Sequence, residues 1–491
     1  MNEMNSHHRD LLLHVARRVM KERSLLPEFS REILSELEGL NAAPLNDGSQ
    51  RKDLRHLLWS SIDNDDSRDL DQLTVAEPLS DGSVKMLVAV ADVDSLVKKG
   101  DAVDDHARHN TTSVYTAGQV FSMLPEKLSY DLTSLNENED RPAMIIEMVF
   151  DAGGRLQASD IYQALVRNQA QLAYNSIAAW LEEGAPEPEP VSAIEGLKEN
   201  LRLQDRMAQK LKTIRHELGA LELQTIQTHA VFDGDAMVAL EIDQKNRARE
   251  LIENLMIAAN GVTAGFLNRK KLPSLRRVVR TPRRWDRIVT LAMDLGFQLP
   301  QNPSSKALSA FLKNQEEKDP LRFPDVSLTV VKLIGSGEYR VAMPGESVEG
   351  HFGLAVKNYT HSTAPNRRFP DLITQRLLKA ALSDAPSPYN EEELNQLAAH
   401  CTQKEDDADK VERQVAKSAA AILLEDRIGE RFSAIVTGAS EKGTWVRIFD
   451  PPIEGMLVEG FDGLDVGDSI QVKLVDTNVD NGYIDFSKMS F

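Results

Sequence analysis

Residues 61–73, SIDNDDSRDLDQL, hold the densest chemical signal in the chain. They carry five aspartates within nine residues, and like charges this close together are costly unless a cation lies among them. Carboxylate oxygens suit Mg²⁺, with Mn²⁺ as the alternative. An acidic surface loop is the competing interpretation, but the apolar residues that frame the stretch indicate a structured turn. The aspartates are Asp63, Asp65, Asp66, Asp69 and Asp71, and the framing residues are Ile62, Leu70 and Leu73.

The segments that follow predict an α+β domain. Residues 73–79 (LTVAEPL), the Asp81-Gly82 turn and residues 84–93 (VKMLVAVADV) predict a β-hairpin, and residues 142–150 predict another buried strand. Residues 182–191 (EEGAPEPEPV) form a Pro/Glu tract that we expect to be too polar to pack. Apolar periodicity and length predict helices at residues 192–217, 246–268, 304–315 and 371–383.

Both ends of the chain differ from this middle. Residues 7–40 predict two helices, with Ser30 as an N-cap and Gly39 near the end of the second. A helix-turn-helix unit and a small helical cap are both open interpretations of this segment. From Glu430 onward, short alternating strands separated by Gly and Asp turns predict a small all-β barrel of the OB type, which commonly binds single-stranded nucleic acid.

Length, cysteine content and net charge restrict the classes of protein to which this chain can belong. A length of 491 residues suggests about three domains, and no apolar run is long enough to cross a membrane. The single cysteine, Cys401, excludes a disulfide within the chain and favours a cytoplasmic protein. The net charge of −19 argues against binding a polyanion, except near residues 266–287, which carry nine Lys/Arg against one Asp. This stretch predicts either a basic stripe that steers a polyanion or a solvated surface.

Several motifs, taken in chain order, resemble the ribonuclease II (RNB) family. Residues 62–73 resemble its Ile-Asp and Asp-x-Asp-Asp motif, and residues 351–380 resemble its second signature, usually Ser-Pro-x-Arg-Arg/Lys-Tyr. VERQVAK at 411–417 resembles the Glu-Arg element that follows, and the tail resembles an S1-type OB domain. The resemblance implies an N-terminal helical segment at 1–50, an RNB catalytic domain at 51–429 and an S1-type RNA-binding domain at 430–491.

The resemblance also implies a role for each matching residue. Asp63, Asp69 and Asp71 match metal-binding aspartates. Tyr115 matches a tyrosine that packs against the 3′-terminal nucleotide, and Arg367 matches an arginine on the scissile phosphate. The implied catalytic set is Asp71, Tyr115, Arg367 and Glu412, and the implied RNA-binding set is Tyr115, Arg367 and Arg368.

These roles imply a hydrolytic 3′-to-5′ exoribonuclease that uses Mg²⁺ to release 5′-nucleoside monophosphates. Its expected substrates are single-stranded RNA 3′ ends, with structured RNA as a further class. We expect a monomer that works in the cytoplasm and does not contact membranes.

Three positions depart from the family pattern. Gln72 occupies the fourth acidic position, where it remains a candidate metal ligand with a neutral oxygen. Ala364 replaces the signature serine and Phe369 the signature tyrosine. The family's usual N-terminal cold-shock-type barrels have no counterpart in residues 1–50. Two alternatives therefore stay open: a catalytically impaired RNA-binding protein on the RNB fold, and an acidic scaffold that only binds divalent ions.

Overall fold

A computed structural model describes residues 7–43, 45, 51–182, 184–243, 245–346, 348–440, 443–464 and 466–489. Its α-helices are α1 (His8–Glu22), α2 (Arg31–Glu38), α3 (Ala102–Asn110), α4 (Tyr174–Glu182), α5 (Glu189–Ser192), α6 (Leu197–Glu217), α7 (Arg247–Arg269), α8 (Trp285–Asp294), α9 (Ser305–Lys318), α10 (Phe323–Ile334), α11 (Phe369–Leu382) and α12 (Glu391–Leu424). Shorter helical turns are η2 (Val93–Ser95), η3 (Lys127–Leu132) and η4 (Glu425–Arg427).

Strands form one large sheet, three small ribbons and a barrel. The sheet contains β1 (Lys52–Asp53), β2 (Ser60–Asp63), β3 (Gln72–Pro78), β4 (Val84–Ala91), β7 (Asp140–Phe150), β8 (Leu156–Arg167) and β9 (Ala170–Ala173). The ribbons pair β5 (Val114–Tyr115) with β6 (Val120–Phe121), β10 (Thr228–Asp233) with β11 (Ala236–Ile242), and β12 (Ser274–Val278) with β13 (Glu338–Ala342). The barrel contains β14 (Arg431–Ser440), β15 (Gly443–Ile448), β16 (Glu454–Glu459), β17 (Ser469–Asn478) and β18 (Tyr483–Lys488).

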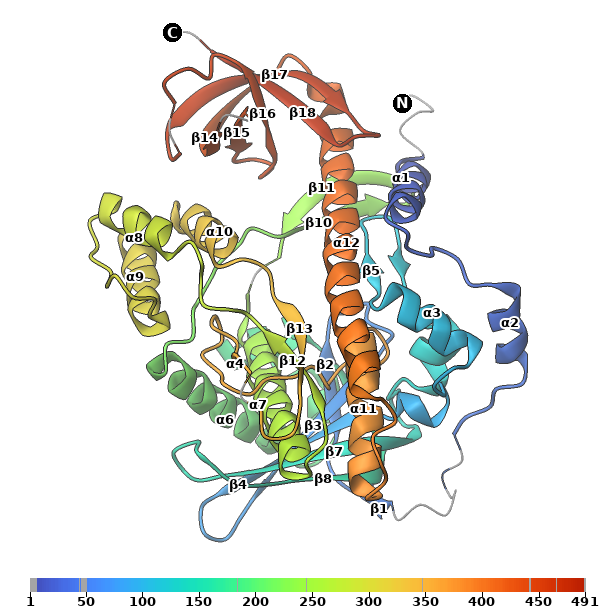
Figure 1. The fold of residues 1–491 in the computed structure, drawn as a ribbon. Coiled ribbons are helices and arrows are strands. Elements are labelled where there is room, and N and C mark those ends of the chain that lie inside the picture. The colour runs from blue at the N-terminus through green and yellow to red at the C-terminus, as the bar shows by residue number, and fades with distance from the viewer. Residues whose placement is uncertain are drawn as a thin grey trace.

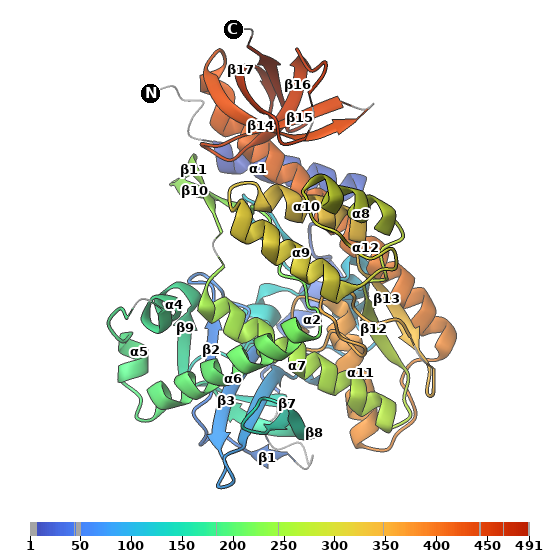
Figure 2. The same ribbon diagram turned by 90° about the vertical axis from the view of Figure 1, so that its left-hand side faces the viewer.

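The sheet has the order β1-β8-β7-β4-β3-β2-β9 and is antiparallel except at its two edge pairs. The predicted hairpin is confirmed: β3 pairs with β4, and Gly82 turns the chain with φ +83°. Helices α6 and α7 pack together against this sheet (Figure 2). The central strands are buried along most of their length, and β4 is apolar along nearly its whole length.

The two N-terminal helices are confirmed, and Ser30 Oγ accepts a hydrogen bond from the Ile33 N–H at 3.3 Å, which makes Ser30 the N-cap of α2. Helix α1 packs along α12, whereas α2 packs against α3. Because the two helices rest on different parts of the α+β domain, these contacts favour the helical cap over the helix-turn-helix alternative.

One interpretation of the Pro/Glu tract was wrong. Part of it forms the short helix α5, and Val191 is buried in the main core with 1% of its surface exposed. Proline near a helix start is compatible with helical geometry, so one apolar residue is enough to anchor the segment.

A single helix of 34 residues, α12, connects the α+β domain to the barrel (Figure 1). The predicted barrel is confirmed as a closed, five-stranded structure in the order β14-β15-β16-β18-β17. Its Arg447 forms an ion pair with Asp325 of α10 at 2.9 Å, and both side chains are nearly buried. No helix in the described part of the chain is long and apolar enough to cross a membrane.

Candidate active site

Adjacent strands bring the ends of the acidic motif together. Asp63 is the last residue of β2, and Asp71 directly precedes β3. Because these strands are antiparallel neighbours in the sheet, the loop between them returns to the edge that it left. Asp71 is almost fully buried, with 2% of its side chain exposed, whereas Asp63 and Asp69 are half-buried. Asp65 is exposed and accepts a hydrogen bond from Asn175 at 3.1 Å. We call the region around Asp63, Asp69 and Asp71 the recess.

The segment before α11 contacts Asp71 directly. The backbone N–H of Asn366 donates to Asp71 Oδ1 at 2.9 Å. Arg367 Nε donates to Asp71 Oδ2 at 3.1 Å. The two signatures, almost 300 residues apart in the chain, thus form one ion-paired centre.

A second carboxylate shapes that segment from inside. Asp371 is fully buried, and its Oδ1 accepts hydrogen bonds from the Ala364 N–H at 2.9 Å and from Arg368 Nη2 at 2.8 Å. Consecutive arginines therefore have different partners: Arg367 pairs with Asp71, and Arg368 pairs with Asp371. This geometry makes Arg367 the arginine at the recess, while an RNA contact for Arg368 stays a prediction.

Tyr115 is held at the recess by α12. Its backbone N–H donates to Glu412 Oε1 at 2.8 Å, and the hairpin β5–β6 packs in a core shared by α1 and α12. The Tyr115 side chain is 44% exposed, yet the surrounding protein raises the pKa of its hydroxyl. The charges of Asp69 and Asp71 add to this pKa rise, so the hydroxyl lies near these aspartates. Glu412 contacts the backbone of Tyr115, so it positions this hairpin.

Electrostatics show that the predicted residues share one environment. Burial raises the pKa of four groups, and the positive charge of Arg367 opposes the rise in each of them. The charge of Asp69 adds to the pKa rise of Asp63, of Asp71 and of Tyr115. The four groups are Asp63, Asp69, Asp71 and Tyr115.

Excess negative charge in a partly buried site is the environment that a divalent cation relieves. Carboxylate oxygens are also the ligands that Mg²⁺ and Mn²⁺ prefer. In the part of the chain that the structure describes, no three His, Cys, Asp or Glu side chains lie close enough to form a ready-made metal group. The aspartates therefore fit a cation by donor chemistry and by electrostatics, and the complete shell requires rotation of side chains or oxygens from a substrate.

Some residues near the recess were not predicted from the sequence. Tyr174 of α4 lies near Asp63, whose charge contributes to a raised pKa of the Tyr174 hydroxyl. The Arg249 guanidinium stacks over the Tyr174 ring at 5.2 Å and donates to the Asn64 side chain at 2.9 Å. Asn366 and Asp371 lay within the second signature and could have been found there, whereas nothing local distinguishes Tyr174 or Arg249.

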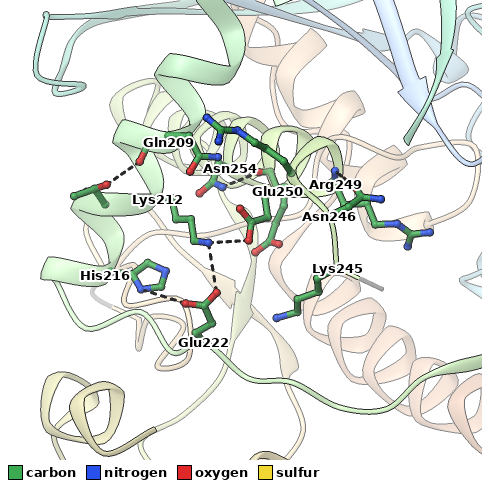
Figure 3. Close-up of polar contacts among 12 residues, drawn as sticks. Gln209, Lys212, His216, Glu222, Lys245, Asn246, Arg249, Glu250 and Asn254 are labelled. Atoms are coloured by element: carbon green, nitrogen blue, oxygen red, sulfur yellow. Dashed lines mark hydrogen bonds and ion pairs between the residues drawn. The ribbon is translucent and has the colours of Figure 1, made fainter. Parts of the chain in front are cut away.

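Figure 3 shows how the first turns of α7, which carry Arg249, are held in place. Lys212 of α6 pairs with Glu250 at 2.7 Å and with Glu222 at 3.4 Å. Asn246 caps α7 by accepting a hydrogen bond from the Arg249 N–H at 2.9 Å. The ion pairs join α6 to α7 and so fix the helix from which Arg249 reaches the acidic loop.

The structure gives the basic residues at 266–287 different environments, so they do not form one uniform stripe. Arg276 is buried and donates to the Ala264 carbonyl at 3.1 Å. Arg277 pairs with Glu405, and Arg280 pairs with Glu338. Packing and ion pairs thus engage these three of the nine basic residues, whereas Arg283, Arg284 and Arg287 are exposed.

Comparison with known proteins places this chain in a family. Residues 51–384 match the RNB domain, and residues 430–489 match the RNase II-type exonuclease C-terminal S1 domain. The chain therefore belongs to the RNB-domain family.

Among similar proteins, Ribonuclease R of Vibrio cholerae is 30% identical over 500 residues, covering 94% of this chain and 59% of the relative. Ribonuclease R of Aquifex aeolicus is 30% identical over 451 residues, covering 89% and 62%. The chain thus spans about three fifths of the length of these relatives.

Solved structures with low sequence identity share the fold. Mycoplasma genitalium RNase R, in complex with ribose-methylated single-stranded RNA, superposes with a TM-score of 0.87 at 22% identity, over 98% of this chain and 78% of that one. Yeast Ssd1, described as a pseudonuclease, superposes with a TM-score of 0.72 at 17% identity, over 90% and 55%. Because a pseudonuclease shares the fold, the residues of the site must decide whether this chain is active.

Proposed function

We propose that this protein is a 3′-to-5′ exoribonuclease that hydrolyses RNA and releases 5′-nucleoside monophosphates. The observation that carries the proposal is the Asp71–Arg367 ion pair, with Tyr115 exposed in the same recess. A site that had lost its function would have no reason to keep a buried carboxylate, an arginine and an accessible aromatic ring together.

Each residue then has a separate task. Tyr115 stacks on the terminal nucleotide and aligns its phosphodiester, which replaces a loose encounter with a fixed geometry. Arg367 donates to the phosphoryl oxygens, where negative charge grows as water attacks phosphorus. The bond from phosphorus to the 3′ oxygen of the preceding nucleotide breaks, and that oxygen leaves as the new 3′ hydroxyl.

Asp63, Asp69 and Asp71 would hold Mg²⁺, or Mn²⁺ in its place, and a bound divalent cation would acidify the attacking water and polarise the phosphoryl oxygen. Gln72 would offer a neutral amide oxygen where the family pattern has a fourth carboxylate, which predicts weaker binding of a second ion. Glu412 acts through Tyr115 by accepting the hydrogen bond of its backbone.

The barrel supplies affinity for single-stranded RNA. OB-type barrels bind nucleic acid strands through aromatic and basic side chains, and this barrel exposes Phe449 and Tyr483. Mycoplasma genitalium RNase R has been solved with double-stranded as well as single-stranded RNA, which supports structured RNA as a further substrate class.

A catalytically impaired RNA-binding protein is the second candidate, and Gln72 favours it. Incubation of a 5′-labelled single-stranded RNA with Mg²⁺, compared with the same reaction in EDTA, decides between the two. Conversion to a short labelled end product together with released nucleoside 5′-monophosphates supports the exoribonuclease. Retention of full-length RNA in a stable complex supports the impaired protein, and the absence of both cleavage and binding refutes both functions.

A further inference from the structure

An apolar groove lies outside the catalytic recess and is lined by residues of helices α6 and α7 and of the ends of β7 and β8. Figures 1 and 2 show where these four elements lie in the fold. We call it the α6–α7 groove; its volume is about 460 Å³. Leu156 lines it and is 47% exposed, although the side chain is fully apolar. A second hollow of about 640 Å³ shares Arg155 and Ile214 with the groove and extends along α6 to Leu218. The lining of this second hollow includes two carboxylates, those of Asp151 and Glu217.

Two glycines that lie one turn apart on α7 contribute to the lining of the groove. Gly261 and Gly265 both line the groove, with Ala258 on the same face. Glycine in a helix interior is costly, because its backbone loses the most freedom on folding. Packing within the fold accounts for a glycine inside a helix only where a larger side chain would collide with a neighbour.

Neither glycine is required by the packing of this chain. A methyl group at Gly261 would meet nothing nearer than the Asn358 carbonyl at 3.7 Å, and one at Gly265 nothing nearer than Arg269 Nη1 at 3.5 Å. Both distances are ordinary van der Waals contacts. Gly350 shows the opposite case, since a methyl group there would lie 2.3 Å from the Val356 carbonyl. The space above Gly261 and Gly265 is therefore available to another molecule.

The charged residues of the groove all have the same sign. Arg155, Arg215 and Arg269 line it together with no aspartate or glutamate, although the protein as a whole carries a net charge of −19. Arg215 is engaged by Asn254 at 2.7 Å, the asparagine seen in Figure 3 where α7 meets the groove. Among the residues that the structure describes, the Arg155 side chain donates no hydrogen bond. The Arg269 guanidinium donates a long hydrogen bond to Ser159 at 3.5 Å and lies 6.0 Å from the centre of the Phe266 ring, and it forms no ion pair in this part of the chain. Two arginines at the rim can thus take carboxylates from outside.

We propose that the α6–α7 groove binds an acidic amphipathic helix of another protein. Its apolar residues, at helical spacing i, i+3, i+4 and i+7, lie on the face formed by Ala258, Gly261 and Gly265, where small residues allow close approach of two helices. Its carboxylates pair with Arg155 and Arg269. The contact lies outside the catalytic recess and does not depend on the proposed exoribonuclease activity.

The test uses the full chain and a fluorescein-labelled synthetic helix of about five turns, with leucines on one face and glutamates beside them. Fluorescence anisotropy should show saturable binding, and a peptide of identical composition in scrambled order should not bind. Gly265→Leu fills the groove and should abolish binding. The double variant Arg155→Glu, Arg269→Glu should weaken binding about tenfold or more by placing like charges together. Arg287→Glu, at an exposed arginine of α8, is the matched control and should bind normally.

A second measurement separates binding from folding. Gly265→Ala should raise the melting temperature by a few degrees, because alanine favours the helix and its methyl group has room there. The same variant should bind the peptide more weakly. A lower melting temperature would show that the fold itself needs this glycine and would overturn the inference. Failure of the peptide to bind, equal binding to the Gly265→Leu protein, preferential binding of a dansylated fatty acid, or self-association through the groove in sedimentation velocity would each overturn it as well.

Discussion

Replacement of Asp71 by asparagine should separate catalysis from folding. The amide oxygen can still accept the Asn366 N–H, but the variant loses the negative charge that faces Arg367. A hydrogen bond to a charged group contributes about 1.5–3 kcal/mol. Part of this loss is offset, because one buried negative charge beside Asp69 disappears. We therefore expect the free energy of unfolding to change by less than about 2 kcal/mol.

Catalysis should respond far more strongly. Asp71 is both an expected cation ligand and the partner that orients Arg367, and loss of one preorganised electrostatic group lowers catalysis by about 10²–10³-fold. Because both roles are lost together, we expect a fall of at least about 10³-fold, or about 4 kcal/mol of activation free energy. RNA affinity should stay nearly unchanged, since the barrel and Tyr115 remain.

The assay is single-turnover cleavage of a 5′-labelled RNA in Mg²⁺, with filter binding in EDTA for affinity and thermal melting for stability. Asp65→Asn is the matched control, because it removes the same charge from the same loop at an exposed position. Cleavage by the Asp71→Asn protein within tenfold of the unmodified protein, or an equal loss in the Asp65→Asn protein, would refute the assignment of Asp71.

Four further outcomes are expected. Gln72→Asp should lower the Mg²⁺ concentration for half-maximal cleavage by adding a charged ligand, and superimposable titrations would leave Gln72 without a role at the metal. Tyr115→Ala should cost about 1–3 kcal/mol of terminal-nucleotide stacking, measured as weaker binding and slower cleavage, whereas Tyr115→Phe should keep most of it; equal loss in both would make the hydroxyl essential. Removal of residues 430–491 should weaken RNA binding and flatten its dependence on salt, and an unchanged slope would exclude phosphate contacts by the barrel. Burial raises the pKa of Glu412 from 4.5 to about 7, so its ionised form destabilises the fold and stability is lost as the pH rises through that window. The melting temperature of Glu412→Gln, relative to that of the unmodified protein, should therefore increase from pH 5 to pH 8. A constant difference would contradict the burial of this carboxyl.

Local patterns were enough for most of the architecture. The apolar residues in 73–93, with Gly82 at the turn, specified the β3–β4 hairpin, since a positive φ there suits glycine best. Ser30 specified the start of α2 because its hydroxyl oxygen accepts an N–H of the first turn. The strand lengths and turns after Glu430 specified the barrel. Each of these features depends on residues close together in the chain, so periodicity and turn chemistry contain the information.

The site depended on contacts between distant residues. The resemblance to the family named Asp71 and Arg367, but only the packed chain joins them at 3.1 Å across 296 positions. It also directs Arg368 to Asp371 and Glu412 to the backbone of Tyr115. The same packing buries Arg276 and places Arg277 and Arg280 in ion pairs with glutamates. From the sequence alone, these three arginines would be expected on an open basic surface. The sequence specifies the charge of each side chain. The partner of that side chain and its exposure to solvent depend on which elements pack together in the folded core.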